Sequence, residues 1–333
     1  MLKMKKLLSI VLITGLVASQ LVGCKAQPTT TTTPAASTDT KKVYKVAFIA
    51  RAQADSFAAW LASAVKDEAK KYDNIKLEVF DGQASDDTEN SLIENAIANK
   101  FDAIIIQPNN GEAQRPYAEK AIKAGIKVIT TNARISGIEG ASSVDADPYA
   151  QATVNAKIAL TQIPENANVV VLKGPPGNFH ADERRKSWQK EFFDKRKDVK
   201  IVGEEIANWN KDEAMNYMET WIQKNPKIDA IIAMNDNMAA GAIEAVKNNE
   251  KYKGIKAYGV DGTAEACLLI EKGLMTSTSL QSAYDLATAI LDTTNKLVTG
   301  KEKVINTDID CPLINKDNVQ KYIDMHKKAG AIK

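Results

Sequence analysis

Two polar residues, Asn235 and Asp261, each follow a short apolar run of the kind that forms a buried strand. Residues 230–234 are continuously apolar and too few for a helix, which is typical of a parallel strand covered on both faces. Residues 255–260 form the second such run. Ligands of open α/β sheets bind outside the carboxyl ends of the strands, so this carboxamide and carboxylate are candidates to contact one small polar ligand. Turn and helix-cap roles, which Asn and Asp also favour, explain the two residues equally well.

Further polar and aromatic side chains follow the other predicted strands. Carboxylates accept hydrogen bonds, a guanidinium donates them and amides do both, so the set suits the hydroxyl groups of a neutral polyhydroxylated ligand. Phe57 and Trp209 lie in opposite halves of the chain and are candidates to sandwich the apolar faces of a sugar ring. The candidate ligand-binding residues are Asp55, Phe57, Asn132, Asn178, His180, Arg184, Trp209, Asn235, Asp261 and Gln281.

Several of these residues also have a plainer explanation. A Trp after a strand, such as Trp209, more often lines a core, and Phe57 also suits simple packing. His180 is one of only two histidines, and a surface position near a helix start is its plainer role. Arg184 begins a basic run, which a solvated helix face explains as well. The argument for a site therefore depends on the agreement of the whole set.

Strands and helices alternate from residue 43 onward, and this alternation positions the candidate residues. It restarts after about residue 147, which predicts an α/β protein with two lobes and parallel sheets. The predicted strands lie near residues 43–50, 75–80, 103–107, 127–131, 168–173, 199–204, 230–234, 255–260 and 276–280. The predicted helices lie near 54–71, 87–99, 112–124 and 283–297, with others starting near 181, 211 and 237; a strand-like piece at 307–314 and a helix at 316–327 end the chain.

A short internal sequence similarity supports two lobes with the same arrangement of elements. FDAIIIQPNN at 101–110 and IDAIIAMNDN at 228–237 occupy the same place in each half and share Asp-Ala-Ile-Ile. The segment from Thr276 onward is too short for a third domain, so we expect it to pass between the lobes as hinge and cover. The predicted N-terminal lobe comprises residues 43–146 and about 282–312, and the predicted C-terminal lobe comprises 147–281 and about 313–333.

The first residues have the features of an export signal. Three lysines precede an apolar stretch, as in a secretory signal peptide spanning residues 1–23. Leu-Val-Gly-Cys at 21–24 resembles the lipobox of bacterial lipoproteins, which implies cleavage before Cys24 and a lipid on its sulfur. An uncleaved anchor is less favoured because the apolar run is shorter than the roughly 20 residues that span a bilayer. Residues 24–42 are expected to be a disordered tether, so the protein is predicted to lie on the outer face of the cell membrane.

Composition excludes several classes of function. About 310 residues remain after such cleavage, enough for two domains, and 44% hydrophobic content suits packed cores. The 44 basic and 42 acidic side chains nearly balance, so a nucleic-acid partner is not expected. Cys267 and Cys311 are expected to be buried free thiols, with a disulfide between them the less favoured alternative. Neither has the neighbours of a metal site, so no metal is expected.

Enzymatic signatures are missing from the sequence. It contains no nucleophile elbow, P-loop, zinc-protease motif or dinucleotide-binding glycine pattern, so neither catalysis nor a cofactor is expected. Asp55 and Asp261 are conceivable as the acid and base of a glycosidase. Plain recognition is favoured over this alternative, because the two carboxylates stand among many amide partners.

Longer stretches resemble the type I periplasmic sugar-binding proteins of bacterial ABC importers, nearest the galactose/glucose-binding branch. The stretches are VVVLKGPPGN, NWNKDEA, DAIIAMNDNMAAGAIEAVK and YGVDGTAEACLLIEKG, within a likeness that covers nearly all of residues 43 to 300. The resemblance implies two Rossmann-like lobes joined by three crossings, a monosaccharide or cyclic polyol between them, an ABC permease as partner and a monomeric state. It implies sugar contacts at Asp55, Phe57, Asn132, Arg184, Trp209, Asn235 and Asp261.

The sequence departs from that branch in three places. Asn178 and His180 replace the His and Asp of its Pro-Gly-His-x-Asp loop, and Gln281 stands where the branch has Asn, as in the ribose-binding branch. Its calcium loop is missing, because residues 161–165 pass directly to a strand. Arg51 and Arg134 lie beside the predicted cleft, so an acidic sugar also remains open.

A sensing role is the alternative to transport. A receptor subunit for signalling or chemotaxis would use the same binding chemistry. The effector domain of a sugar-responsive repressor resembles this fold too, but it needs an N-terminal DNA-binding helix pair where this chain has the predicted signal peptide.

Overall fold

The computed structural model describes residues 42–225 and 227–333. The predicted signal peptide, the lipidation site Cys24 and nearly all of the predicted tether lie outside the described residues. Within the described ranges, no helix is both long enough and apolar enough to cross a membrane.

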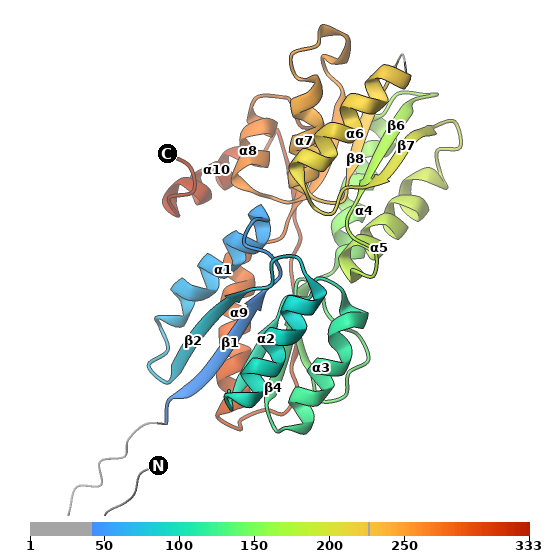
Figure 1. The fold of residues 1–333 in the computed structure, drawn as a ribbon. Coiled ribbons are helices and arrows are strands. Elements are labelled where there is room, and N and C mark those ends of the chain that lie inside the picture. The colour runs from blue at the N-terminus through green and yellow to red at the C-terminus, as the bar shows by residue number, and fades with distance from the viewer. Residues whose placement is uncertain (1–41, 226) are drawn as a thin grey trace, which may run out of the picture. The chain divides into compact units, whose positions relative to one another are not determined.

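The first sheet has six parallel strands (Figure 1). Its central strands are almost wholly apolar and buried, as expected of a parallel sheet with helices on both faces. The sixth strand comes from near the end of the chain and extends the sheet beyond β5. In spatial order the strands are β11 (Asn306–Ile309), β5 (Ser142–Ala146), β4 (Lys127–Thr131), β3 (Ala103–Ile106), β1 (Tyr44–Ala50) and β2 (Ile75–Asp81).

The second sheet repeats this plan with one exception. Five of its strands are parallel, and the edge strand β12 runs antiparallel to β10. In spatial order the strands are β12 (Leu313–Asn315), β10 (Ser277–Leu280), β9 (Lys256–Asp261), β8 (Ala230–Ala233), β6 (Asn168–Lys173) and β7 (Lys200–Ile206). The predicted α/β fold with two parallel-sheet lobes is confirmed.

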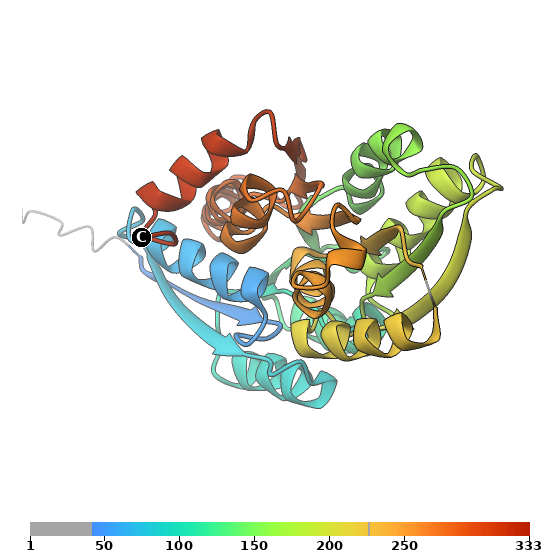
Figure 2. The ribbon, with the colours of Figure 1, turned by 90° about the horizontal axis from the view of Figure 1, so that it is seen from above.

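Helices cover both faces of each sheet (Figures 1 and 2). Nearly all of them begin at a Ser, Thr, Asp or Asn whose side chain accepts a hydrogen bond from the first turn, which satisfies otherwise unpaired N–H groups. The α-helices are α1 (Ser56–Ala69), α2 (Asp86–Ala98), α3 (Gly111–Lys123), α4 (Pro148–Gln162), α5 (Phe179–Trp188), α6 (Lys211–Lys224), α7 (Asp236–Val246), α8 (Ala264–Glu271), α9 (Ala283–Val298) and α10 (Val319–Lys328). A π-helical turn (Gln189–Phe193) extends α5, and a 3₁₀ turn (Glu250–Tyr252) precedes β9.

The hydrophobic cores follow the two sheets. In the first lobe, α1 and α9 pack on one face of the sheet, and α2 and α3 pack on the other. The second lobe is built around one larger cluster that includes the aromatic rings of Trp188 and Phe192. Each lobe therefore has its own core, which leaves the surfaces between the lobes free to carry polar side chains.

Three segments link the two sheets. They lie between β5 and α4, between β10 and α9, and between β11 and β12. The single strand-like piece predicted at 307–314 is therefore wrong: its first part pairs with β5 and its last part with β10. Asp310, Cys311 and Pro312 separate the two strands, and Pro312 O accepts a hydrogen bond from Leu280 N at 2.8 Å.

The sequence analysis missed β5 and α4. β5 reads Ser-Ser-Val-Asp-Ala, which has no apolar alternation, yet all five residues are buried between neighbouring strands. α4 follows a recognisable start signal, because Asp147 caps it and Pro148 occupies its first turn. These two elements carry the chain out of the first lobe and into the second.

In both sheets, the chain adds strands first toward one edge and then toward the other, which creates a switch point between two neighbouring strands. This switch point lies between β1 and β3 in the first sheet and between β6 and β8 in the second. Ligand crevices of open sheets form at the carboxyl ends of such strands. The segments that follow β1, β4, β6, β7 and β8, together with Asp261 at the end of β9, all contribute to one pocket.

Candidate ligand-binding site between the two lobes

One pocket gathers nine of the ten predicted site residues. Gln281 does not line it, and Arg51 does. Nine of its ten lining residues are buried, and Asn132 is partly buried, so the lobes are closed around it. The lining residues are Arg51, Asp55, Phe57, Asn132, Asn178, His180, Arg184, Trp209, Asn235 and Asp261.

The wall from the first lobe centres on an ion pair. Arg51 Nη2 lies 2.7 Å from Asp55 Oδ2, and both side chains are buried. The other carboxylate oxygen of Asp55 accepts from Ala58 N at 2.7 Å and so caps α1. Gln107 connects this pair to the next strand, because its Oε1 accepts from Arg51 N at 3.1 Å and its Nε2 donates to Asn132 Oδ1 at 2.6 Å. The Asn132 side chain keeps its NH₂ group as a donor for the pocket.

The wall from the second lobe centres on Arg184, which is only 2% exposed. Its Nε and Nη2 donate to Gln151 Oε1 at 3.0 and 2.8 Å, and its Nη1 donates to Met234 O at 2.8 Å. The Asp261 carboxylate lies 3.8 Å from Arg184 Nη2, near enough for attraction but too far for a hydrogen bond. The suggested solvated helix face is therefore wrong for Arg184, and its neighbour Arg185 takes that role by pairing with Glu204.

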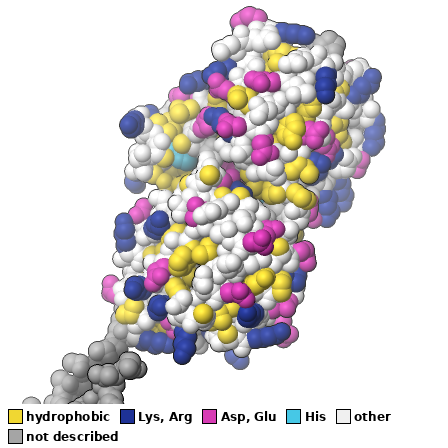
Figure 3. Space-filling model, in the orientation of Figure 1, with side chains coloured by type: hydrophobic (Ala, Val, Ile, Leu, Met, Phe, Trp, Pro, Cys, Tyr) yellow, Lys and Arg dark blue, Asp and Glu magenta, His cyan; other side chains and the backbone are white. Residues whose placement is uncertain are grey.

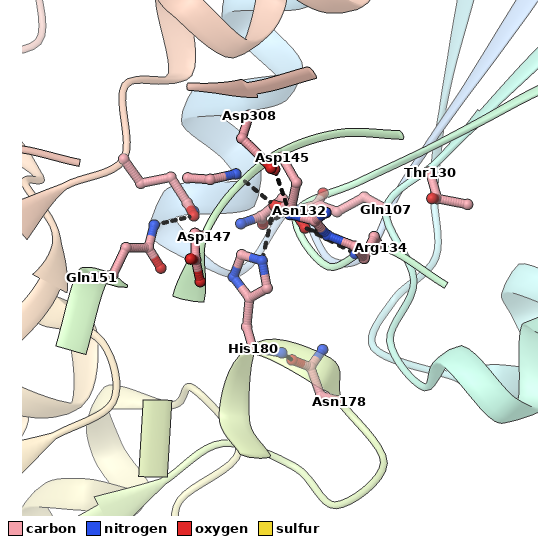
Figure 4. Close-up of polar contacts among 12 residues, drawn as sticks. Gln107, Thr130, Asn132, Arg134, Asp145, Asp147, Gln151, Asn178, His180 and Asp308 are labelled. Carbon is pink, nitrogen blue, oxygen red and sulfur yellow. Dashed lines mark hydrogen bonds and ion pairs between the residues drawn. The ribbon is translucent and has the colours of Figure 1, made fainter. Parts of the chain in front are cut away.

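His180 connects the two walls. Its Nδ1 lies 3.0 Å from Arg184 Nη2, which can only donate, so Nδ1 accepts and Nε2 carries the proton. That Nε2–H group points to Asp145 Oδ1 of the first lobe at 2.8 Å (Figure 4). Burial lowers the pKa of His180 below its ordinary 6.5; Asp145 raises it, and Arg184 and Arg134 lower it further. A neutral imidazole therefore bridges the lobes at neutral pH, and the suggested surface position for His180 is wrong.

The Arg134 side chain forms its contacts outside the pocket. Its guanidinium forms an ion pair with Asp308, and its backbone N–H donates to Asp145 Oδ2 at 3.0 Å (Figure 4). It does not line the pocket. The only other cation suggested for an acidic ligand, Arg51, is paired with Asp55.

Asp261 has the most unusual backbone of the site. Its φ is +125°, a region that residues with a side chain rarely adopt, and the carboxylate is 3% exposed. Burial raises its pKa well above the ordinary value, against the attraction of Arg184. Asn132 and Trp209 of the same pocket also have positive φ values, 41° and 63°. Strained conformations of this kind are concentrated at binding sites, where the surrounding fold maintains them.

Two aromatic residues supply the apolar surface of the pocket. Phe57 and Trp209 are 3% and 5% exposed, and each also belongs to the core of its own lobe, so the packing role and the site role coincide. Gly174 lies directly against the Trp209 ring, where an added Cβ atom would be 2.1 Å away. Only glycine leaves room for the indole in this position.

Two amide residues combine capping with a place in the pocket. Asn235 Oδ1 caps α7 by accepting from Met238 N at 2.9 Å, as predicted, and the residue also lines the pocket, with its NH₂ group left as a donor. Asn178 caps α5 and donates from Nδ2 to Asn109 O of the first lobe at 3.2 Å. Its hydrogen-bonding groups are thus used for capping and lobe contact.

Gln281 and Gln151 lie behind the pocket. Gln151 Nε2 donates to Gln281 Oε1 at 2.7 Å, and Gln151 Oε1 accepts from Arg184. Gln281 Oε1 also accepts from Arg184 Nη2 at 3.4 Å, so Gln281 contacts Arg184 directly and through Gln151 and does not line the pocket. Gln151, Gln107 and Asp145 escaped the sequence analysis. Gln107 is marked by its position at the end of an apolar run, whereas Gln151 and Asp145 lie in the two elements that were missed.

In the described ranges, no group of three or more His, Cys, Asp or Glu side chains is arranged to hold a metal ion. Cys267 and Cys311 are free thiols, Cys267 buried and Cys311 partly so, and burial raises the pKa of both. They are not paired with each other.

The sequence of residues 46–302 matches the periplasmic binding protein domain family. The chain belongs to this family. Its members are solute-binding proteins of transporters and not enzymes, and membership implies a location outside the cytoplasm. The family resemblance inferred from sequence is therefore confirmed.

Curated relatives of this periplasmic binding protein share its length. The xylitol-binding protein of Mycolicibacterium smegmatis is 30% identical over 78% of this chain and 74% of its own. The D-apiose import binding protein of Paraburkholderia graminis is 32% identical over 78% of this chain and 82% of its own. Among solved structures, the Caulobacter myo-inositol binding protein bound to myo-inositol has a TM-score of 0.79 at 25% identity, covering 85% of this chain and 97% of that one.

Proposed function

We propose that this periplasmic binding protein captures a neutral monosaccharide or cyclic polyol in the pocket between its lobes and delivers it to an ABC permease. The observation that carries the proposal is the charge balance of the pocket: two guanidinium groups, Arg51 and Arg184, face two carboxylates, Asp55 and Asp261. An anionic or cationic ligand would leave one buried charge uncompensated. Hydroxyl groups can instead accept from the amides and donate to the carboxylates.

The two rings complete the argument for a ring-shaped ligand. Phe57 and Trp209 enter the pocket from opposite lobes and offer flat surfaces to the C–H faces of a sugar or cyclitol. The named ligands of the relatives above, xylitol, apiose and myo-inositol, are all neutral polyhydroxylated compounds. This agreement supports a neutral polyhydroxylated ligand, whereas the ring shape rests on Phe57 and Trp209, because xylitol is an open-chain polyol.

Closure of the lobes follows from the contacts that cross between them. The His180–Asp145 and Asn178–Asn109 hydrogen bonds join the two lobes. Because nine of the ten lining residues are buried in the closed form, a sugar enters only when the lobes separate. A ligand that contacts both walls then shifts the population toward the closed form, which is the form expected to engage the permease.

The proposal includes membrane attachment through a lipid on Cys24 after cleavage of residues 1–23, and a monomeric state. A Cys24→Ser variant should leave the membrane fraction of the producing bacterium and fail to incorporate radiolabelled palmitate. A sedimentation experiment on the purified protein should give the mass of one chain. Lipid incorporation by the Cys24→Ser variant would refute the anchor.

The ligand class is tested by calorimetric titration of protein that has been unfolded and refolded to remove any bound compound. The panel is glucose, galactose, ribose, xylose, xylitol, apiose, myo-inositol and galacturonate. Binding of a neutral member at micromolar affinity, about −8 kcal/mol, is the expected result. Tightest binding of galacturonate would refute the charge-balance argument, and no binding by protein shown to be folded would refute the ligand class.

A further inference from the structure

We propose that a second hollow between the lobes is a binding site for a small neutral molecule that carries a planar ring and a hydroxyl group. This hollow encloses about 390 Å³ and is separate from the first pocket. Trp60 of α1 and Tyr284 of α9 line it from the first lobe, and Thr263, Glu265 and His326 line it from the second. In Figure 3 the two lobes meet at a hollow on the face shown, with hydrophobic and histidine side chains beside it.

Aromatic rings form one wall of the second hollow. The Trp60 ring lies 5.5 Å from the Tyr284 ring in an edge-to-face arrangement and 5.0 Å from the His326 ring. Small residues that follow α10 complete the wall: Ala329, Gly330 and Ala331. Flat, mostly apolar walls of this kind favour a planar ring as the occupant.

Two polar ring atoms beside this hollow lack partners among the described residues. Trp60 Nε1–H is a donor, and His326 Nδ1 is the second such atom. His326 is only 1% exposed, and its Nε2–H donates to Gly262 O at 2.9 Å, so Nδ1 offers a lone pair. One hydroxyl group inserted between the rings would accept from the indole and donate to the imidazole. Both atoms are buried, so the Trp60 ring must turn to admit the hydroxyl group.

The charges around the second hollow favour a neutral occupant. None of the residues that line it is Lys or Arg, so an anion would find no counter-charge there. The one carboxylate, Glu265, already pairs with Lys211 at 2.5 Å. Burial lowers the pKa of His326, which keeps the imidazole uncharged at neutral pH.

Occupation of this site should couple to the first pocket. The hollow is lined from both lobes, so its full lining exists only while the lobes are closed. Phe57, which lines the first pocket, packs edge-to-face on Trp60 at 5.7 Å. A molecule bound against Trp60 and His326 therefore favours the form that binds the sugar, and by linkage each ligand raises the affinity for the other. This coupling, but not the second site itself, rests on the proposed function.

The test uses p-cresol as the probe and toluene, which lacks the hydroxyl, as its matched control. The chain has four tryptophans, Trp60, Trp188, Trp209 and Trp221, so the indole N–H region of a ¹⁵N spectrum contains four signals. The Trp60 signal, assigned by its loss in Trp60→Phe, should shift in a saturable manner with p-cresol. Toluene should bind at least threefold more weakly. Millimolar p-cresol should also raise the affinity for the panel sugar at least twofold.

Two variants keep the test decisive. Ser63 lines the hollow from an exposed position of α1, so Ser63→Phe should fill the site without disturbing the core and should abolish the p-cresol shift. Ser91→Phe places the same ring on an exposed position of α2 outside the hollow and should leave the shift unchanged.

Shifts spread over all four indole signals, equal binding of toluene, or an undiminished shift in Ser63→Phe would each overturn the second site. If p-cresol shifts the Trp60 signal as expected but leaves the sugar affinity unchanged, the coupling between the two sites would be overturned and the second site would stand. Absence of sugar binding would count against the proposed function and leave the p-cresol result standing by itself.

Discussion

Protonation of His180 should open the lobes and release the ligand. In the closed form Nδ1 accepts from Arg184 and Nε2–H donates to Asp145, so a second ring proton would meet a guanidinium. The pKa of His180 in this form is lowered by burial, whereas separated lobes expose the imidazole and return its pKa toward 6.5. The open form therefore binds the proton more tightly than the closed form does.

The sign and size of the effect follow from this difference. Ligand affinity should have its full value above about pH 6.5. It should fall as the pH drops from there toward the lowered pKa of His180 in the closed form. One proton changes the affinity by at most tenfold per pH unit, about 1.4 kcal/mol. Calorimetric titrations of the preferred sugar at pH 7.5, 6.5 and 5.5 measure this slope directly.

Other titratable groups face the same region, so a control variant is needed. Asp145 lies on the opposite lobe. Asp261 faces Arg184, and because burial raises its pKa in the closed form, its protonation favours closure and opposes the effect of His180. His180→Gln keeps an acceptor for Arg184 and a donor for Asp145 but cannot titrate. Its ligand affinity should no longer fall as the pH drops, and any rise that remains should disappear in the Asp261→Asn background. A pH-independent wild type, or an unchanged slope in His180→Gln, would refute the reasoning.

Three further outcomes are expected. Trp209→Ala should weaken sugar binding at least tenfold, about 1.4 kcal/mol, in calorimetry, because one stacking surface is lost; unchanged affinity would remove Trp209 from the site. Gln151→Ala leaves the pocket lining intact but removes an acceptor of the Arg184 guanidinium, so sugar binding should weaken at least fivefold. A variant that lost only thermal stability would show that Gln151 does not position Arg184. Asn235→Ala removes the cap of α7 and should lower the free energy of unfolding in urea by about 1 kcal/mol as well as weaken binding, whereas loss of binding alone would contradict its capping role.

The parts of the fold that were predictable are those in which local and global signals agree. Apolar runs such as Ala230–Ala233 are buried strands, and the polar residues that follow them cap the next helix. β5 could not be recognised because its burial comes from neighbouring strands and not from its own composition. The chain from 306 to 315 resembles one strand in sequence, and only the arrangement of the two sheets divides it.

The prediction of the site was limited in the same way as that of the fold. The types of residue in the pocket could be predicted because they all follow strand ends. The burial of His180 and Arg184 could not, since α5 is strongly polar in sequence and these side chains are covered by residues far away in the chain, such as Asp145 and Met234. Gln281 likewise belonged to the correct segment, but it lies behind the pocket lining, bonded to Gln151 of the missed helix α4.

The helix caps described above also limit how this scaffold can be redesigned as a sensor for other compounds. Asp55, Asn178 and Asn235 line the pocket and at the same time begin α1, α5 and α7. A library that varies them would confound changes in selectivity with losses of expression, since each cap supports a helix. Keeping the three caps constant in such a library separates changes in selectivity from losses of helix stability.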